Sequence, residues 1–136
     1  MAGEIKSVTL TWQAGLQFTG GPPHGPQTTV DGDNTAAPGP MLTLLLAAAS
    51  CTGSDVVSIL QKMRVQLREF QINVAGVRRD DDPRRYLSIH FDYLVRGEGL
   101  DELKVRRAID LSLEKYCSVI HSLATDIAVT YAVSLG

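Results

Sequence analysis

The most constraining feature of this sequence is an apolar stretch that opens with Pro40 and ends on Cys51. Thr43 and Ser50 are the polar residues within it. Proline suits the first turn of a helix, so the stretch predicts a helix that is apolar on every face. Such a helix must be buried on all sides. One small sheet covers only one side, so we expect a homodimer that places two copies of this helix at its centre.

The length and charge of the chain narrow the class of protein. At 136 residues, the chain predicts one domain over residues 1–136. Thirteen Lys and Arg against 15 Asp and Glu leave a formal charge of −2, so we expect no nucleic-acid partner. The apolar stretch is shorter than the ~20 residues that a bilayer requires. The first residues lack the pattern of a secretion signal, so we predict a cytoplasmic protein with no membrane partner.

The remaining periodicity predicts strands and helices in separate groups. Residues 5–12 alternate, with Val8, Leu10 and Trp12 on one face, and predict a half-buried strand that forms a hairpin with residues 16–19. A loop rich in glycine and proline follows at 20–39, in which only residues 27–31 look extended. The helix from residue 40 is interrupted at Thr52-Gly53-Ser54-Asp55, where a second piece could begin. Two antiparallel strands, near 70–77 and 86–95, flank a charged turn at 78–85. The second of these strands has one apolar face, made by Leu87, Ile89, Phe91, Tyr93 and Val95. A second helix is predicted from 100 to 126, and its apolar line passes through Leu103, Ile109, Leu113, Cys117, Ile120 and Ala124. A last strand at 127–135 completes an α+β fold.

Two cysteines, Cys51 and Cys117, are the candidates for chemistry. No CxxC and no Cys/His cluster is present, so we expect no metal and no cofactor. In a reducing compartment two cysteines are free thiols or a transient redox pair more often than a permanent disulfide. They can also be inert apolar filler. Their placement favours function, because Cys51 ends the apolar run and Cys117 faces inward on the second helix.

Two segments of the chain resemble a known family. Residues 40–63, which contain Pro40-Met41, Cys51 and the run Asp55 to Leu60, are similar to the first cysteine helix of the OsmC/Ohr proteins. These are the osmotically inducible and organic hydroperoxide resistance proteins. Residues 107–119, which end in Lys115-Tyr116-Cys117-Ser118-Val119, resemble the second cysteine helix of the same family. Trp12, Gly15-Leu16, Phe18 and Val30-Asp31-Gly32 also match the family, so the resemblance covers nearly the whole chain. It is greatest to a branch with this Lys-Tyr-Cys-Ser-Val motif and no defined substrate.

The resemblance implies both an assembly and an activity. It implies an intertwined α+β homodimer, with antiparallel strands around two cysteine-bearing helices and the sites at the interface. It also implies a thiol-dependent peroxidase that acts on organic hydroperoxides in the oxidative stress response. Cys51 would attack the peroxide and become a sulfenic acid, and Cys117 would condense with it to a disulfide. An external dithiol would then reduce the pair.

The chain departs from the family pattern at the groups that activate the first cysteine. Active members use an arginine from the N-terminal glycine-rich loop and a glutamate just before the cysteine helix. Residues 20–39 contain no arginine or lysine, and Leu42 stands where the glutamate is expected. The sequence therefore predicts weak peroxidase activity. The alternative is a non-catalytic protein that binds an apolar small molecule in the dimer-interface pocket, which the cysteines would only line.

Three other residues lie where they could influence the thiols. His121, one turn after Cys117, could polarise it, although a surface histidine is the simpler interpretation. His24 lies in the glycine-rich loop beside Pro22-Pro23, and we interpret it as an exposed loop histidine. Asp55 follows Cys51 by one turn, so its charge would oppose thiolate formation, and we predict that it caps a helix.

Overall fold

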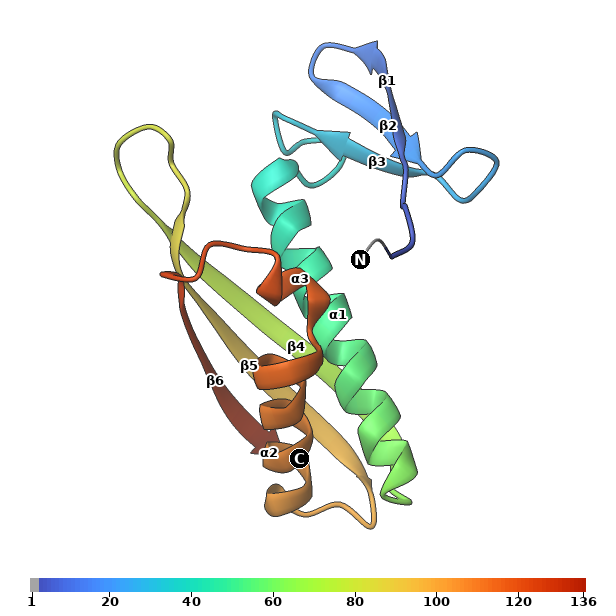
Figure 1. Ribbon diagram of the computed structural model, residues 1–136, viewed down its shortest axis with the longest axis vertical. Coiled ribbons are helices and arrows are strands. Elements are labelled where there is room, and N and C mark those ends of the chain that lie inside the picture. The colour runs from blue at the N-terminus through green and yellow to red at the C-terminus, as the bar shows by residue number, and fades with distance from the viewer. Residues whose placement is uncertain (1–2) are drawn as a thin grey trace. The chain divides into compact units, whose positions relative to one another are not determined.

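The computed structural model describes residues 3–136, whose contacts divide into two compact units between Leu44 and Leu45. The first unit holds a sheet of three short strands, and the second holds a longer sheet with its helices (Figure 1). The α+β class and the order of strands and helices predicted above are confirmed. The helix α1, Pro40–Lys62, begins in the first unit and continues into the second.

The first unit is an antiparallel sheet of β1, β2 and β3, with bounds Thr9–Ala14, Gln17–Gly21 and Thr28–Asp31. Gly15 makes the tight turn of the hairpin with a φ of +56°, a conformation that glycine adopts without steric cost. The predicted apolar face of the first strand is uncovered, since Trp12 is 64% exposed and Leu10 is exposed beside it. Alternation predicted the strand correctly but also predicted half-burial, which this chain alone does not provide.

Asp31 organises the loop that follows β3. Its side chain is buried and accepts hydrogen bonds from the backbone N–H groups of Asp33, Thr35 and Ala36 and from the Thr35 hydroxyl. These bonds stabilise the ionised form and lower the pKa of Asp31 to about 2, with the Ala36 N–H as the largest contribution. The chain is thereby held in a defined turn shortly before α1 begins.

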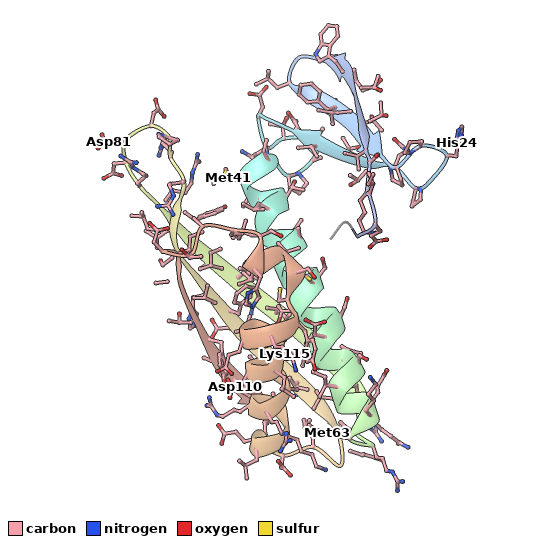
Figure 2. All side chains as sticks on the ribbon, in the orientation of Figure 1. His24, Met41, Met63, Asp81, Asp110 and Lys115 are labelled. Carbon is pink, nitrogen blue, oxygen red and sulfur yellow. The ribbon has the colours of Figure 1, made fainter. Side chains whose placement is uncertain are left out.

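The second unit contains a sheet in the order β4-β5-β6. The strands β4, Gln66–Arg78, and β5, Tyr86–Glu98, are antiparallel, as predicted, and the charged segment between them is exposed. Asp81 lies in this connection (Figure 2). The last strand, β6, Ala128–Leu135, runs parallel to β5, so the expectation of antiparallel strands throughout was wrong for β6. Parallel neighbours need a long crossover connection, and the segment that carries Cys117 supplies it.

The core of the second unit lies on one face of this sheet, where β5 alternates between inside and outside. A shift in register near Val77 and Arg78 leaves Leu87 exposed, so the prediction that Leu87 shares the inner face was wrong. The helices α1 and α2 lie across the inner face (Figure 1). The fully buried side chains from strand and helices are Ile89, Phe91, Tyr93, Val95, Val56, Leu60, Val105, Ala108 and Ile109.

Helix α1 is continuous, so the prediction of two pieces was wrong. Thr52 and Gly53 are buried within it, and a Cβ at position 53 would stand 3.4 Å from Ile72 and 3.5 Å from Phe70. These are ordinary van der Waals distances, so α1 packs against β4 at this position without a break. The helix is covered on one side only, because Leu46 is 58% exposed. By length and composition alone its 23 residues could also span a membrane, a test that core helices of soluble proteins pass as well.

The second cysteine segment is not the single helix that the sequence predicts. Helix α2, Glu102–Leu111, is capped by Asp101, whose carboxylate accepts the Lys104 N–H at 2.8 Å. A π turn, Ser112–Tyr116, follows it, and the short helix α3, Ser118–His121, comes after Cys117. Leu103 is 82% exposed, so the predicted apolar line of this helix fails at its first member.

Candidate functional site

Cys117 occupies the break between the π turn and α3. Its backbone is extended, with a ψ of 96°, and its N–H donates to the carbonyl oxygen of Ser112 at 2.7 Å. The side chain is fully buried, which confirms the prediction that it faces the core. A π turn inside a helix is uncommon and frequently marks a functional position.

Cys51 lies on α1, 66 residues earlier in the sequence, and its side chain lies near that of Cys117. The two thiols are close enough for Cys51 to raise the pKa of Cys117. Both cysteines are free, and Cys51 is half-buried whereas Cys117 is fully buried. The more accessible thiol is therefore the one that a substrate could reach.

The surroundings of Cys117 favour the neutral thiol. Burial is the main cause that raises the pKa of Cys117 to about 11, and the nearby Cys51 and the Asp55 carboxylate act in the same direction. The backbone N–H of Ile120 opposes them, with a smaller effect. At pH 7 about one molecule in ten thousand carries this thiol in its ionised form.

A chain of hydroxyl groups links the two helical segments beside the thiols. The Ser112 Oγ lies 2.8 Å from Thr52 Oγ1 and 2.9 Å from Asp55 Oδ2. Thr52 Oγ1 in turn lies 2.8 Å from the Tyr93 hydroxyl oxygen, and all three hydroxyl residues are fully buried. Burial raises the pKa of Tyr93 to about 12, so its hydroxyl remains a hydrogen-bond donor.

Asp55, which accepts a hydrogen bond at the end of these linked hydroxyl groups, has a different role from the one predicted. Asp55 does not cap a helix, because α1 passes through it without a break, and its carboxylate instead accepts the Ser112 hydroxyl. Sequence reasoning missed Thr52, Ser112 and Tyr93 as members of the site. A signal was present, since Thr52 directly follows Cys51 and Ser112 lies on the apolar face of a helix five residues before Cys117.

The two histidines considered as influences on the thiols are both exposed. His121 is exposed, and its Nε2 lies 3.1 Å from the Leu113 carbonyl oxygen, with which it forms a hydrogen bond. His24 is exposed in the loop between β2 and β3 of the first unit (Figure 2). Across residues 3–136, no group of three His, Cys, Asp or Glu side chains is arranged to hold a metal ion.

A shallow groove of about 630 Å³ runs along the exposed side of α1. It is formed mainly by apolar and small side chains of α1 and β4. The lining residues include Leu46, Ala49, Gly53, Val57, Phe70 and Ile72. A second cavity, of about 420 Å³, lies among α2, α3 and β6 and is lined in part by Asp110, Glu114 and Tyr131.

The fold and the thiol pair define an OsmC-like protein. Residues 31–132 match the family described as OsmC-like protein, and the chain belongs to this family. Protein YhfA of Escherichia coli K12 is 39% identical over 124 residues, which cover 90% of this chain and 92% of YhfA.

Solved structures share the same fold. The structure of a hypothetical protein from Aquifex aeolicus is 30% identical and superposes with a TM-score of 0.84 over 98% of this chain and 99% of its own. The organic hydroperoxide resistance protein OhrB of Bacillus subtilis is 14% identical with a TM-score of 0.62, over 96% of this chain and 98% of its own. That distant likeness concerns the fold alone.

Proposed function

We propose that this protein is a thiol-dependent peroxidase that reduces organic hydroperoxides with Cys51 and Cys117. The observation that carries the proposal is the meeting of two free cysteines from segments 66 residues apart, one half-buried and one fully buried. An accessible thiol beside a protected one suits a two-cysteine cycle, because the first meets the peroxide and the second waits for the oxidised product.

The cycle balances with an external dithiol as reductant. The Cys51 thiolate attacks one peroxide oxygen, the O–O bond breaks, and the organic fragment leaves as an alcohol after taking up a proton. Cys51 is then a sulfenic acid, and Cys117 attacks its sulfur to form a disulfide and release water. Exchange with the external dithiol returns both cysteines to thiols and leaves that reductant as a disulfide.

The electrostatics of the site support a slow enzyme. The Asp55 carboxylate is a negative group near the thiols, and it disfavours a second negative charge there. Cys117 attacks as a thiolate, and burial holds its pKa at about 11. The loop at 20–39 contains no arginine or lysine, and Leu42 replaces the expected glutamate, so neither activating group of the family pattern is present.

The homodimer belongs to the same proposal. The apolar side chains of β1 and of the outer side of α1 are exposed in the single chain. A second copy would cover both surfaces and supply the burial that an apolar helix requires. We also place the protein in the cytoplasm, where thiols are kept reduced between cycles.

Consumption of an alkyl hydroperoxide with a dithiol reductant tests the activity. We expect turnover by the native chain, none by Cys51→Ser, and a single oxidation by Cys117→Ser that stops at a sulfenic acid. The sulfenic acid can be trapped with dimedone and detected by mass spectrometry. The matched control is Ser118→Ala, which changes an exposed residue beside Cys117 and should retain native turnover. Equal activity of the native chain and Cys51→Ser would contradict the proposal.

The groove on α1 favours a second candidate function, that of a binding protein for an apolar small molecule. Its lining is largely apolar, and it lies on the helix that carries Cys51. Thiol labelling at pH 7 separates the two candidates. If Cys51 reacts with iodoacetamide no faster than free cysteine and an apolar dye binds the native chain, the binding protein is the better description. Faster labelling of Cys51 supports the peroxidase.

A further inference from the structure

Ser112 contacts both sides of the thiol site, through its backbone and through its side chain. Its carbonyl oxygen accepts the Cys117 N–H at 2.7 Å, and this bond across five residues closes the π turn. Its hydroxyl lies within hydrogen-bond distance of Thr52 and Asp55 on α1. Ser112 thus joins the segment that carries Cys117 directly to the helix that carries Cys51.

The hydrogen bonds around Ser112 have a defined direction. A serine hydroxyl carries one hydrogen, and a carboxylate can only accept, so Ser112 donates to Asp55. Thr52 must then donate to Ser112, and Tyr93 must donate to Thr52, because each hydroxyl has one hydrogen to give. In the described part of the chain, no buried side-chain nitrogen or oxygen lacks a partner. The chain of three hydroxyls is therefore complete and ends on one charged acceptor.

Linked hydrogen bonds of this kind restrain the relative position of the two helical segments more tightly than apolar packing does. Apolar side chains can slide against one another at little cost, whereas a hydrogen bond between hydroxyls weakens once the oxygens leave a range of about 2.5 to 3.0 Å. Burial makes an unpaired hydroxyl costly, so the bonds form together or the arrangement is lost. On α1, Thr52 is adjacent to Cys51 and Asp55 lies one turn beyond it. The two segments are consequently fixed beside the thiols.

We propose that Ser112, together with Thr52 and Asp55, is a positioning residue that sets the effective concentration of the Cys117 thiol at Cys51. The proposal builds on the proposed function, since it concerns the closure of the same pair to a disulfide. In closure two S–H bonds are lost, one S–S bond forms, and the oxidant takes up two electrons and two protons. An organic hydroperoxide would become an alcohol and water, and diamide becomes its hydrazine.

Diamide tests the proposal without any hydroperoxide. The rate of disulfide closure is followed by loss of free thiols in the native chain and in Ser112→Ala, with Ser118→Ala as the matched control. The reduction potential of each pair is then measured against glutathione. We expect closure about tenfold slower in Ser112→Ala and a potential about 30 mV more positive, since a tenfold change in the equilibrium constant corresponds to about 30 mV. The control should match the native chain.

A second variant keeps the test decisive if Ser112→Ala does not fold. Thr52→Val removes one hydroxyl and nearly preserves the shape of the side chain. It should also slow disulfide closure and make the reduction potential more positive. Unchanged closure and potential in folded variants whose melting temperatures fall would overturn the proposal, because the hydroxyls would then serve only stability. A native pair that fails to close with diamide would overturn it too. A pair that closes with diamide but does not turn over hydroperoxide refutes only the peroxidase.

Discussion

Replacement of Cys51 by serine leaves Cys117 as the single thiol of the chain, so its ionisation can be followed alone. Burial raises the pKa of Cys117 to about 11 from the ordinary 9.0. An ordinary thiol is half ionised at pH 9, whereas a thiol with this pKa is about 1% ionised there. Carbon-13 NMR of the labelled Cys117 Cβ should therefore show no titration up to pH 9.5 in Cys51→Ser.

The same change of pKa links stability to alkaline pH. Above pH 9 the unfolded chain loses the Cys117 proton while the folded chain retains it, so the unfolded state binds fewer protons. The free energy of unfolding should fall as pH rises from about 9 to about 11, with a slope of at most about 1.4 kcal/mol per pH unit from this group. Below pH 9 both states are protonated and Cys117 contributes no pH dependence.

Urea unfolding of the native chain and of Cys117→Ala, at several values of pH, measures this contribution. The difference in the free energy of unfolding between the native chain and Cys117→Ala should be constant below pH 9. It should change above pH 9, because only the native chain carries this thiol. A Cys117 signal that titrates near pH 9 or below in the folded protein would refute the reasoning. It would show that the thiol is accessible to water or is stabilised as a thiolate by a cation.

Three further outcomes follow from the structure. Tyr93→Phe removes the first donor of the hydroxyl chain, so the free energy of unfolding measured in urea should fall by about 1 kcal/mol. Asp31→Asn should lower the melting temperature at neutral pH; because the folded pKa of Asp31 is about 2, that stabilisation is lost as pH falls through about 2, and the two melting curves should converge there. Leu46→Glu, on the exposed side of α1, should convert the proposed dimer to a monomer in analytical ultracentrifugation, whereas Leu103→Glu on α2 should not.

The alternation of apolar residues was sufficient to predict the strands of the second unit. A period of two residues is typical of strands, so the sequence predicted β5 and the alternate residues from Ile89 to Val95 that form its buried face. The register shift that exposes Leu87 could not be read, because it depends on the opposing strand. The parallel direction of β6 is likewise invisible in its own residues.

The thiol pair was predictable in its members but not in its surroundings. A helical period placed Cys117 toward the core, and the residues that break the helix around it carry no strong local signal. Thr52 to Asp55 were read as a helix stop because these residue types favour caps in isolation. In the folded protein the tertiary hydrogen bonds of Thr52 and Asp55 with Ser112 override that preference.

The exposed tryptophan on β1 gives the protein an optical reporter of its own. Trp12 is the only tryptophan of the sequence, and its indole N–H donates to the Gly15 carbonyl oxygen within the hairpin. Fluorescence excited at the red edge of the absorption band therefore comes from the first unit alone. An indole in water emits at longer wavelengths than one under an apolar cover. The emission maximum of Trp12 therefore reports, without any label, whether this face of β1 is exposed to water or covered at a given protein concentration.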